Sequence, residues 1–96
     1  MEIKIFNKTG KFAGNKDIAK DIRLNEILPL LDKEKNIVLN FGNVDLATQS
    51  FIHALISDVI RQKGIDVLKR IYFKECNETI KKIIEIVIEY MQGSNY

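Results

Sequence analysis

The hydroxyl side chains best placed for chemistry lie at a junction between an apolar segment and a helical segment. Asn36–Val44 has the composition of a strand followed by a turn, and Thr48 and Ser50 open the helical pattern after it. The first four backbone N–H groups of a helix have no acceptor within the helix. A hydroxyl beside them can cap the helix, accept a phosphoryl group or contact a partner. We therefore take this junction as the candidate functional site.

His53, the only histidine, lies three residues after Ser50, so the two side chains share one helix face. A serine and a histidine together could form a nucleophilic pair. The sequence offers no obvious acid at the same site to orient the histidine, and no glycine-rich oxyanion turn. We therefore expect a partly exposed structural histidine and no enzymatic activity. A small hydrolase is the least supported alternative.

The single cysteine, Cys76, stands just before Asn77, a suitable N-cap for the last helix. A helix N-terminus can lower the pKa of a thiol, but a packing residue or a neutral loop thiol is the simpler interpretation. Cys76 and His53 are too few for a metal site, and neither Cys-x-x-Cys nor His-x-x-x-His spacing occurs. We expect no metal and no cofactor.

Length and composition describe one globular domain, residues 1–96. The 15 basic and 13 acidic residues give a net charge of +2, which does not favour nucleic acid as a partner. No apolar run approaches the length that spans a bilayer, the N-terminus lacks the layout of a signal peptide, and one cysteine excludes an intrachain disulfide. We expect a cytoplasmic protein that binds neither membranes nor specific nucleic acid, and the oligomeric state stays open.

Basic side chains near the last strand and helix do not form a phosphate-binding stripe. Glu75, Glu78 and Glu85 are interleaved with them, which indicates a mixed solvated surface. The basic residues concerned are Lys69, Arg70, Lys74, Lys81 and Lys82.

Alternating strand and helix patterns predict the elements that position the junction. Strands are expected at Met1–Asn7, Lys11–Ala13, Ile37–Phe41 and Leu68–Lys74, and helices at Lys16–Asp32, Thr48–Lys63 and Asn77–Gly93. The first two strands are expected to form a hairpin. Pro29 predicts a kink or break between Asp21 and Pro29, Gly64 is expected to end the middle helix, and the tail 93–96 is expected to be loose.

The expected fold class is α/β, with one small mixed sheet and helices mainly on one side of it. Three consecutive apolar residues, Ile37, Val38 and Leu39, suggest that the central strand is covered on both faces.

The junction residues also resemble those of a known family. Val38–Val44 followed by Thr48-Gln49-Ser50-Phe51 is similar to the central motif of a STAS-like domain family of unknown function, which resembles the STAS domains of anti-anti-sigma factors. Glu26–Leu31 resembles the family's helix ending in Leu-x-Pro-Leu-Leu, and Ile71–Lys74 with Asn77 resembles its closing strand and helix. The resemblance covers most of the chain from about residue 14 onward and implies a STAS-like fold.

Two departures from the pattern bear on regulation. Asn40 stands where the family usually has Asp. In anti-anti-sigma factors the helix opens Asp-Ser-Ser-Gly and the first Ser is phosphorylated. Gln49 takes that position here and Ser50 matches the second Ser. The resemblance therefore does not carry over the phosphoacceptor, and phosphorylation of Ser50 or Thr48 stays a hypothesis based on the residues alone.

The resemblance implies a regulatory protein–protein interaction domain, with an ATPase-type kinase or an anti-sigma-like regulator as partner. The alternative function is binding of a nucleotide or small anionic ligand at the N-terminus of the helix that starts near Thr48. The predicted partner-binding residues are Gly42, Asn43, Val44, Asp45, Thr48, Gln49, Ser50 and His53.

Overall fold

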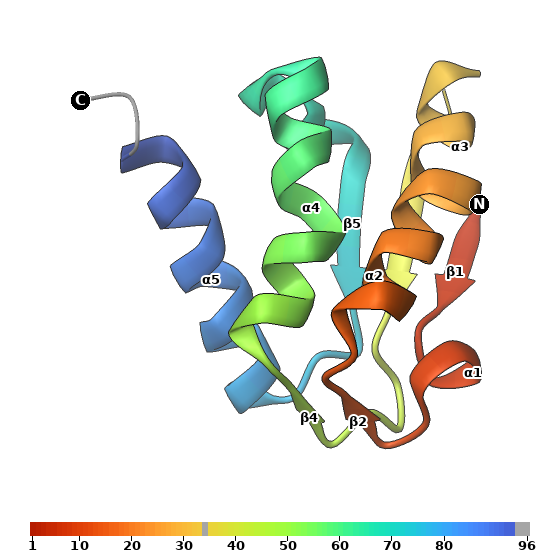
Figure 1. The fold of residues 1–96 in the computed structure, drawn as a ribbon, viewed down its shortest axis with the longest axis vertical. Coiled ribbons are helices and arrows are strands. Elements are labelled where there is room, and N and C mark those ends of the chain that lie inside the picture. The colour runs from red at the N-terminus through yellow and green to blue at the C-terminus, as the bar shows by residue number, and fades with distance from the viewer. Residues whose placement is uncertain (34, 94–96) are drawn as a thin grey trace.

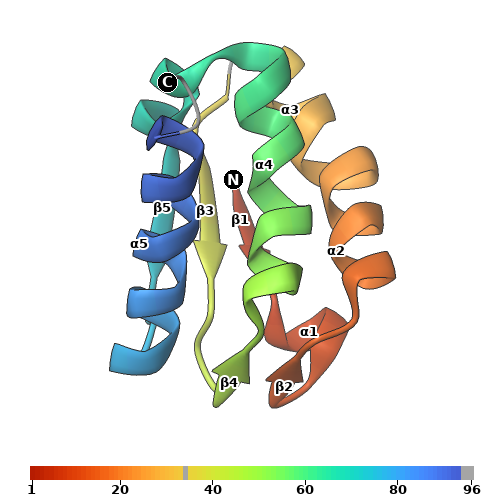
Figure 2. The same ribbon diagram turned by 60° about the vertical axis from the view of Figure 1, so that its left-hand side comes forward.

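The computed structural model of the chain describes residues 1–33 and 35–93. A parallel three-stranded sheet is formed by β1 (Glu2–Lys4), β3 (Ile37–Asn40) and β5 (Ile71–Lys74), in the order β1-β3-β5. The main helices all lie on one side of this sheet (Figures 1 and 2). A second, two-stranded parallel sheet pairs β2 (Phe12–Ala13) with β4 (Leu46–Ala47).

The helical elements connect these strands. They are α1 (Phe6–Thr9), α2 (Lys16–Ile22), the π-helical turn η1 (Arg23–Ile27), α3 (Leu28–Asp32), α4 (Gln49–Lys63), the 3₁₀ helix η2 (Ile65–Arg70) and α5 (Glu78–Gly93). The predicted α/β class with helices on one side is confirmed. In detail, two small parallel sheets replace the single mixed sheet that we expected. Residues 94–96 of the expected loose tail lie outside the described residues.

The predicted hairpin between the first two strands is wrong. Residues Phe6–Thr9 form a helical turn, because the carbonyl of Ile5 accepts the N–H groups of Lys8 and Thr9 at 2.9 and 3.0 Å. The side chain of Ile5 is fully buried, and its N–H donates to the carbonyl of Asn40. β1 therefore pairs with β3, and β2 pairs with β4 instead of with β1.

The irregularity predicted near Pro29 is present as a widened helical turn. The N–H of Leu28 donates to the carbonyl of Arg23, five residues earlier. This shift in the hydrogen-bond ladder comes directly before Pro29, which lacks an N–H to donate and would crowd the carbonyl of Asn25 in a regular helix. α2, η1 and α3 therefore follow one another without a break as one helical unit.

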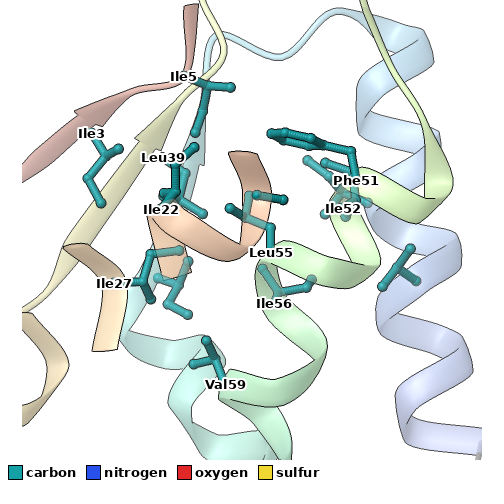
Figure 3. Packing of buried hydrophobic residues seen from close by; sticks show 14 of the residues in the cluster. Ile3, Ile5, Ile22, Ile27, Leu39, Phe51, Ile52, Leu55, Ile56 and Val59 are labelled. Carbon is teal, nitrogen blue, oxygen red and sulfur yellow. The ribbon is translucent and has the colours of Figure 1, made fainter. Parts of the chain in front are cut away.

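The core lies between the three-stranded sheet and the helices. Ile3, Ile5 and Leu39 point toward buried side chains of α2, η1 and α4, as Figure 3 shows. The other face of the sheet carries Glu2, Lys4, Val38, Asn40, Tyr72 and Lys74, none of which is buried. The expectation that the central strand is covered on both faces is wrong, because burial alternates along β3.

No helix within the described part of the chain has both the length and the apolar character needed to cross a membrane.

Candidate functional site

Thr48 caps α4, as one of the open interpretations of the sequence predicted. Its backbone is extended (φ −82°, ψ 156°), and its Oγ1 accepts the N–H of Phe51 at 3.1 Å. Its own N–H donates to the carbonyl of Ala13 at 3.0 Å, which fixes the start of α4 against β2. The Oγ of Ser50 lies 3.3 Å from the Oγ1 of Thr48, and Ser50 is exposed. Of the two hydroxyls, that of Ser50 is the one presented to solvent.

The turn between β3 and β4 is held by backbone and amide contacts. The Oδ1 of Asn40 accepts the N–H of Gly42 at 2.7 Å, and the carbonyl of Phe41 accepts the N–H of Val44 at 3.0 Å. Asn43 has a positive φ of 68°, which Asn tolerates better than most residues. Val44 is only 3% exposed, so its side chain anchors the turn to the hydrophobic core. Asn43 and Asp45 are the exposed members of the predicted set in this turn.

Asn40 also explains how the chain tolerates the departure from the family's Asp. Its amide nitrogen donates to carboxylate oxygens of Glu2 at 2.9 Å and Glu75 at 3.2 Å. A carboxylate in its place could still accept from Gly42 but would face two other carboxylates. The amide of Asn40 can accept a hydrogen bond from Gly42 and also donate to Glu2 and Glu75, whereas a carboxylate could only accept.

Asn77 joins the turn to the last helix. Its Oδ1 accepts the N–H of Ile80 at 2.9 Å, which confirms the predicted cap of α5. Its Nδ2 donates to the carbonyl of Asp45 at 2.9 Å. The second contact was not predicted from the sequence, because the amide of a capping residue has no periodic signal that indicates its distant acceptor.

Two exposed apolar side chains stand next to the predicted site. Phe12 is 56% exposed and Leu46 is 43% exposed, and they are direct neighbours in the register of β2 and β4. A Cβ added at Gly14 would collide with the ring of Phe12, so the ring lies over the backbone of Gly14. Leu46 falls within the predicted surface, whereas Phe12 was not predicted from the sequence. The available signal was the position of this aromatic residue in a short segment between Gly10 and Gly14. Such a segment offers few neighbouring side chains to cover an aromatic ring.

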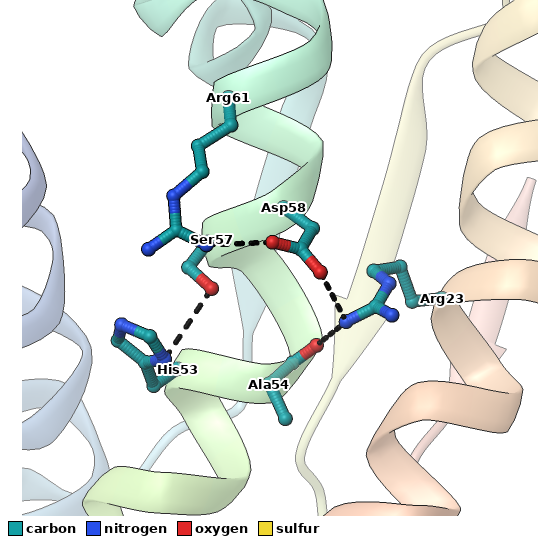
Figure 4. Close-up of polar contacts among 6 residues, drawn as sticks. All are labelled: Arg23, His53, Ala54, Ser57, Asp58 and Arg61. Atoms are coloured by element: carbon teal, nitrogen blue, oxygen red, sulfur yellow. Dashed lines mark hydrogen bonds and ion pairs between the residues drawn. The ribbon is translucent and has the colours of Figure 1, made fainter.

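His53 has the contacts of a structural side chain. Its Nδ1 lies 3.3 Å from the Oγ of Ser57, and its ring centroid is 6.2 Å from that of Tyr90 on α5. Ser57 is only 2% exposed and faces His53 from one turn further along α4 (Figure 4). The serine paired with His53 is therefore Ser57 and not Ser50, and it has no access to a substrate.

A buried arginine connects the helical unit of α2, η1 and α3 to α4. Arg23 is 8% exposed, and its Nη1 donates to the carbonyl of Ala54 at 2.7 Å and pairs with Asp58 at 3.2 Å. Asp58 also pairs with Arg61 at 2.6 Å (Figure 4). The bridge links α4 to η1. It was not predicted, because arginine is usually exposed.

Cys76 is not an activated thiol. Partial burial raises the pKa of its thiol, and the positive charge of Lys81 offsets part of that effect. Among residues 1–33 and 35–93, no group of three or more His, Cys, Asp or Glu side chains could hold a metal ion.

A shallow depression lies beside the first turn of α4. It is lined by Lys16, Gln49, Ser50, His53 and Ala54. The structure thus places Gln49, Ser50 and His53 on one surface, whereas Gly42 and Asn43 line a separate depression with Asn40 and Glu75. Phe12 and Leu46 lie at the end of the molecule where the turn after β3 meets β2 and β4 (Figures 1 and 2). We call this whole region, Phe12 with Gly42–His53, the junction surface.

No curated protein and no solved structure matches the chain. The profile of one family, described as a STAS-like domain of unknown function (DUF4325), matches residues 19–81, about two-thirds of the chain. The matched region runs from α2 through the junction to the start of α5 and agrees with the observed α/β fold. The chain therefore belongs to the family of STAS-like domains of unknown function.

Proposed function

We infer that this domain works by regulatory protein–protein interaction, and that its partner docks on the junction surface. The observation that carries the inference is the exposed pair of Phe12 and Leu46 beside the start of α4. Membership of the STAS-like family supports a regulatory protein as the partner. The STAS domains of anti-anti-sigma factors, which this family resembles, bind such proteins. An ATPase-type kinase or an anti-sigma-like protein is the partner we propose.

Exposed apolar residues scattered singly are normal on protein surfaces. Phe12 and Leu46 differ from that case because they are adjacent across two paired strands and because the ring of Phe12 lies over Gly14. An aromatic side chain with a restricted position loses little entropy on binding and suits the centre of an interface. The pair is therefore a good candidate for the anchor of the docking site.

Exposed polar side chains flank Leu46 in the sequence, and polar side chains form the rim of a typical interface. Asn43 and Asp45 lie on the turn, and Gln49 and Ser50 lie on the first turn of α4; all four are exposed. The backbone beneath them is fixed by Asn77, Thr48 and Ala13 through the hydrogen bonds described above. A partner would thus meet a preformed surface and would not have to order a loop.

Binding is better supported than catalysis. The hydroxyl of Thr48 caps α4, and His53 contacts the buried Ser57 and the ring of Tyr90. Neither arrangement gives Ser50 a general base. We therefore propose a function without an enzymatic step.

Affinity purification from the native cell tests this proposal. We expect the wild-type protein to retain an ATPase-type kinase or anti-sigma-like protein, identified by mass spectrometry, and Phe12→Ser to lose it. Leu24→Ser serves as the matched control, because Leu24 is 46% exposed on η1, outside the junction surface. Equal recovery of the partner with both variants would refute docking at this surface.

The depression beside α4 favours one alternative function, the binding of a nucleotide or small anion. Lys16 and Ser50 line it next to the N-terminus of α4, and such a terminus attracts anions. A ligand that binds only the folded state raises its melting temperature. A rise of several degrees with ATP or GTP would support this alternative, whereas an unchanged melting temperature together with partner capture would support docking.

Phosphorylation of the junction, if it occurs, is expected at Ser50. The hydroxyl of Thr48 is used in capping, whereas Ser50 is exposed in the first turn of α4. A phosphate there would add about −1.5 to −2 charge and would alter a contact with a partner. Mass spectrometry of protein from its native cell checks this, and an unmodified peptide spanning residues 48–50 under all growth conditions would rule it out.

A further inference from the structure

Helix α5 stands at the edge of the helical layer, next to α4, and carries uncovered apolar side chains (Figures 1 and 2). Ile86 is 48% exposed, Tyr90 is 62% exposed and Ile83 is only partly covered. Residues three and four positions apart lie on one face of a helix, so these three form a continuous row, which we call the α5 stripe. His53 borders it from α4, because its ring centroid is 6.2 Å from that of Tyr90. An aligned set of exposed apolar side chains, unlike a single one, marks an interaction site.

The charges beside the α5 stripe are opposite at its two ends. Lys82 comes one residue before Ile83, and Glu89 comes one residue before Tyr90. The two charges therefore lie on the same flank of the stripe, two helical turns apart. Both side chains are exposed, and neither forms an ion pair within residues 1–33 and 35–93. The flank is positive toward the N-terminus of α5 and negative toward its C-terminus.

The other charged residues near α5 lie further from the stripe. Lys81 and Glu85 line the depression between β5 and α5, on the other side of the helix. Glu78 begins α5, beyond the end of the stripe. On α4, Asp58 and Arg61 pair with each other at 2.6 Å. Lys82 and Glu89 are thus the charges that a molecule seated on the stripe would meet.

Two α5 helices that pack side by side in opposite directions satisfy both charges. Lys82 of one copy then lies beside Glu89 of the other, and two-fold symmetry repeats the pair. The axis passes close to Ile86, whose side chain packs against its own counterpart, and Glu78 comes opposite the uncharged Gly93. Parallel helices would instead place like charges side by side. The helix therefore supplies both the apolar contact and its own charge complement.

We propose that the α5 stripe is the interface of a two-fold symmetric homodimer whose two α5 helices run antiparallel. A second copy is the occupant because the charge pattern beside the stripe is complementary to itself. α5 supplies most of the contact, so we expect a dimer that dissociates on dilution and not an obligate one with a large interface. The stripe lies outside the junction surface, so this proposal does not depend on docking there, and each dimer would present two junction surfaces.

Sedimentation equilibrium of the purified protein at increasing concentration tests the proposal. We expect a monomer–dimer equilibrium that Ile86→Glu weakens at least about tenfold, because two carboxylates would meet near the axis. Ile65→Glu is the matched control, since Ile65 is 39% exposed on η2, away from α5, and it should associate like the wild type. Circular dichroism checks that both variants are folded. A wild-type monomer at every concentration up to the millimolar range, or equal association of the two variants, would overturn the proposal.

Charge reversal tests the antiparallel orientation. Lys82→Glu alone would face Glu89 of the second copy, and Glu89→Lys alone would face its Lys82, so each should weaken the dimer about fivefold. The double variant should recover the wild-type dissociation constant, because both pairs are restored with reversed signs. Lys81→Glu makes the same charge change on the other side of α5 and should have no effect. A double variant that stays weak, or equal effects of Lys81→Glu and Lys82→Glu, would show that the helices do not pair in this way.

Discussion

Thr48 and Ser50 have different roles although they are only two residues apart. The hydroxyl of Thr48 accepts the N–H of Phe51, whereas that of Ser50 is exposed. The sequence alone allowed either residue to be the cap, a phosphosite or a docking contact. The geometry assigns the cap to Thr48 and leaves Ser50 available at the surface.

Thr48→Ala should destabilise the protein by about 1 kcal/mol, because the N–H of Phe51 loses its acceptor at the start of α4. Ser50→Ala should change the free energy of unfolding by less than about 0.5 kcal/mol, as is usual for an exposed side chain. Urea denaturation of both variants measures the difference. Equal effects of the two substitutions would contradict the assigned cap.

Cys76 should react slowly with thiol reagents in the folded protein. Burial raises the pKa of its thiol, so the reactive thiolate is scarcer at neutral pH than in a free cysteine. The rate should increase as the pH rises toward the pKa, and it should increase on unfolding in urea. Lys81→Gln should slow the reaction further, since the charge of Lys81 lowers this pKa. Fast labelling at neutral pH in the native state would contradict this account.

At the scale of elements, the sequence predicted most of the helices and their ends. Thr48 caps α4, Gly64 follows its last turn, and Asn77 caps α5. These signals are local, because a cap acts on backbone groups within three or four residues of it. Pro29 likewise indicated an irregular helix. The amino-acid sequence could not show that the irregularity would be a widened turn over Arg23–Ile27.

The strand pairings that were predicted wrongly depend on distant residues. Phe12–Ala13 pairs with Leu46–Ala47, more than thirty positions later, and each strand has two residues. Such a short segment carries no periodic signal, so a local hairpin with β1 was the natural expectation. The helical turn at Phe6–Thr9 directs the chain away from β1 and removes that possibility.

Gly64→Ala should destabilise the protein by roughly 1–3 kcal/mol. Gly64 follows α4 with φ +88° and ψ 161°, a conformation that only glycine adopts readily. No atom lies within 4 Å of an added Cβ, so the cost comes from the backbone and not from crowding. Thermal unfolding measures the change in stability. Gly14→Ala serves as a comparison in which the cost comes from crowding, because the ring of Phe12 must move. An unchanged melting temperature for Gly64→Ala would contradict this assignment.

At the scale of the whole molecule, one side of the three-stranded sheet is packed and the other is polar. Leu39 and Ile37 are buried against the helices, whereas Asn40 and Lys74 face outward. Three apolar residues in a row at Ile37–Leu39 suggested two covered faces, but Val38 is only partly covered. Alternation along β3 follows from the pleat of the strand and not from the hydropathy of each residue.

The candidate site was predicted in part. Asn43, Asp45, Gln49 and Ser50 are exposed together, as expected of a surface built on one strand-to-helix junction. Phe12 was missed because it comes from a separate strand, thirty residues before the turn. Arg23 was missed because only the packed structure shows that α4 supplies acceptors for a buried guanidinium.

The affinity of a purified partner for two leucine variants tests the central claim most directly. Leu46 and Leu24 are 43% and 46% exposed, so Leu46→Ala and Leu24→Ala remove similar side chains from similar environments. Calorimetric titration should show that Leu46→Ala weakens binding by about 2 kcal/mol, as for an anchor residue, and that Leu24→Ala binds like the wild type. Equal affinity of the two variants, or a loss confined to Leu24→Ala, would show that the partner does not dock on the junction surface.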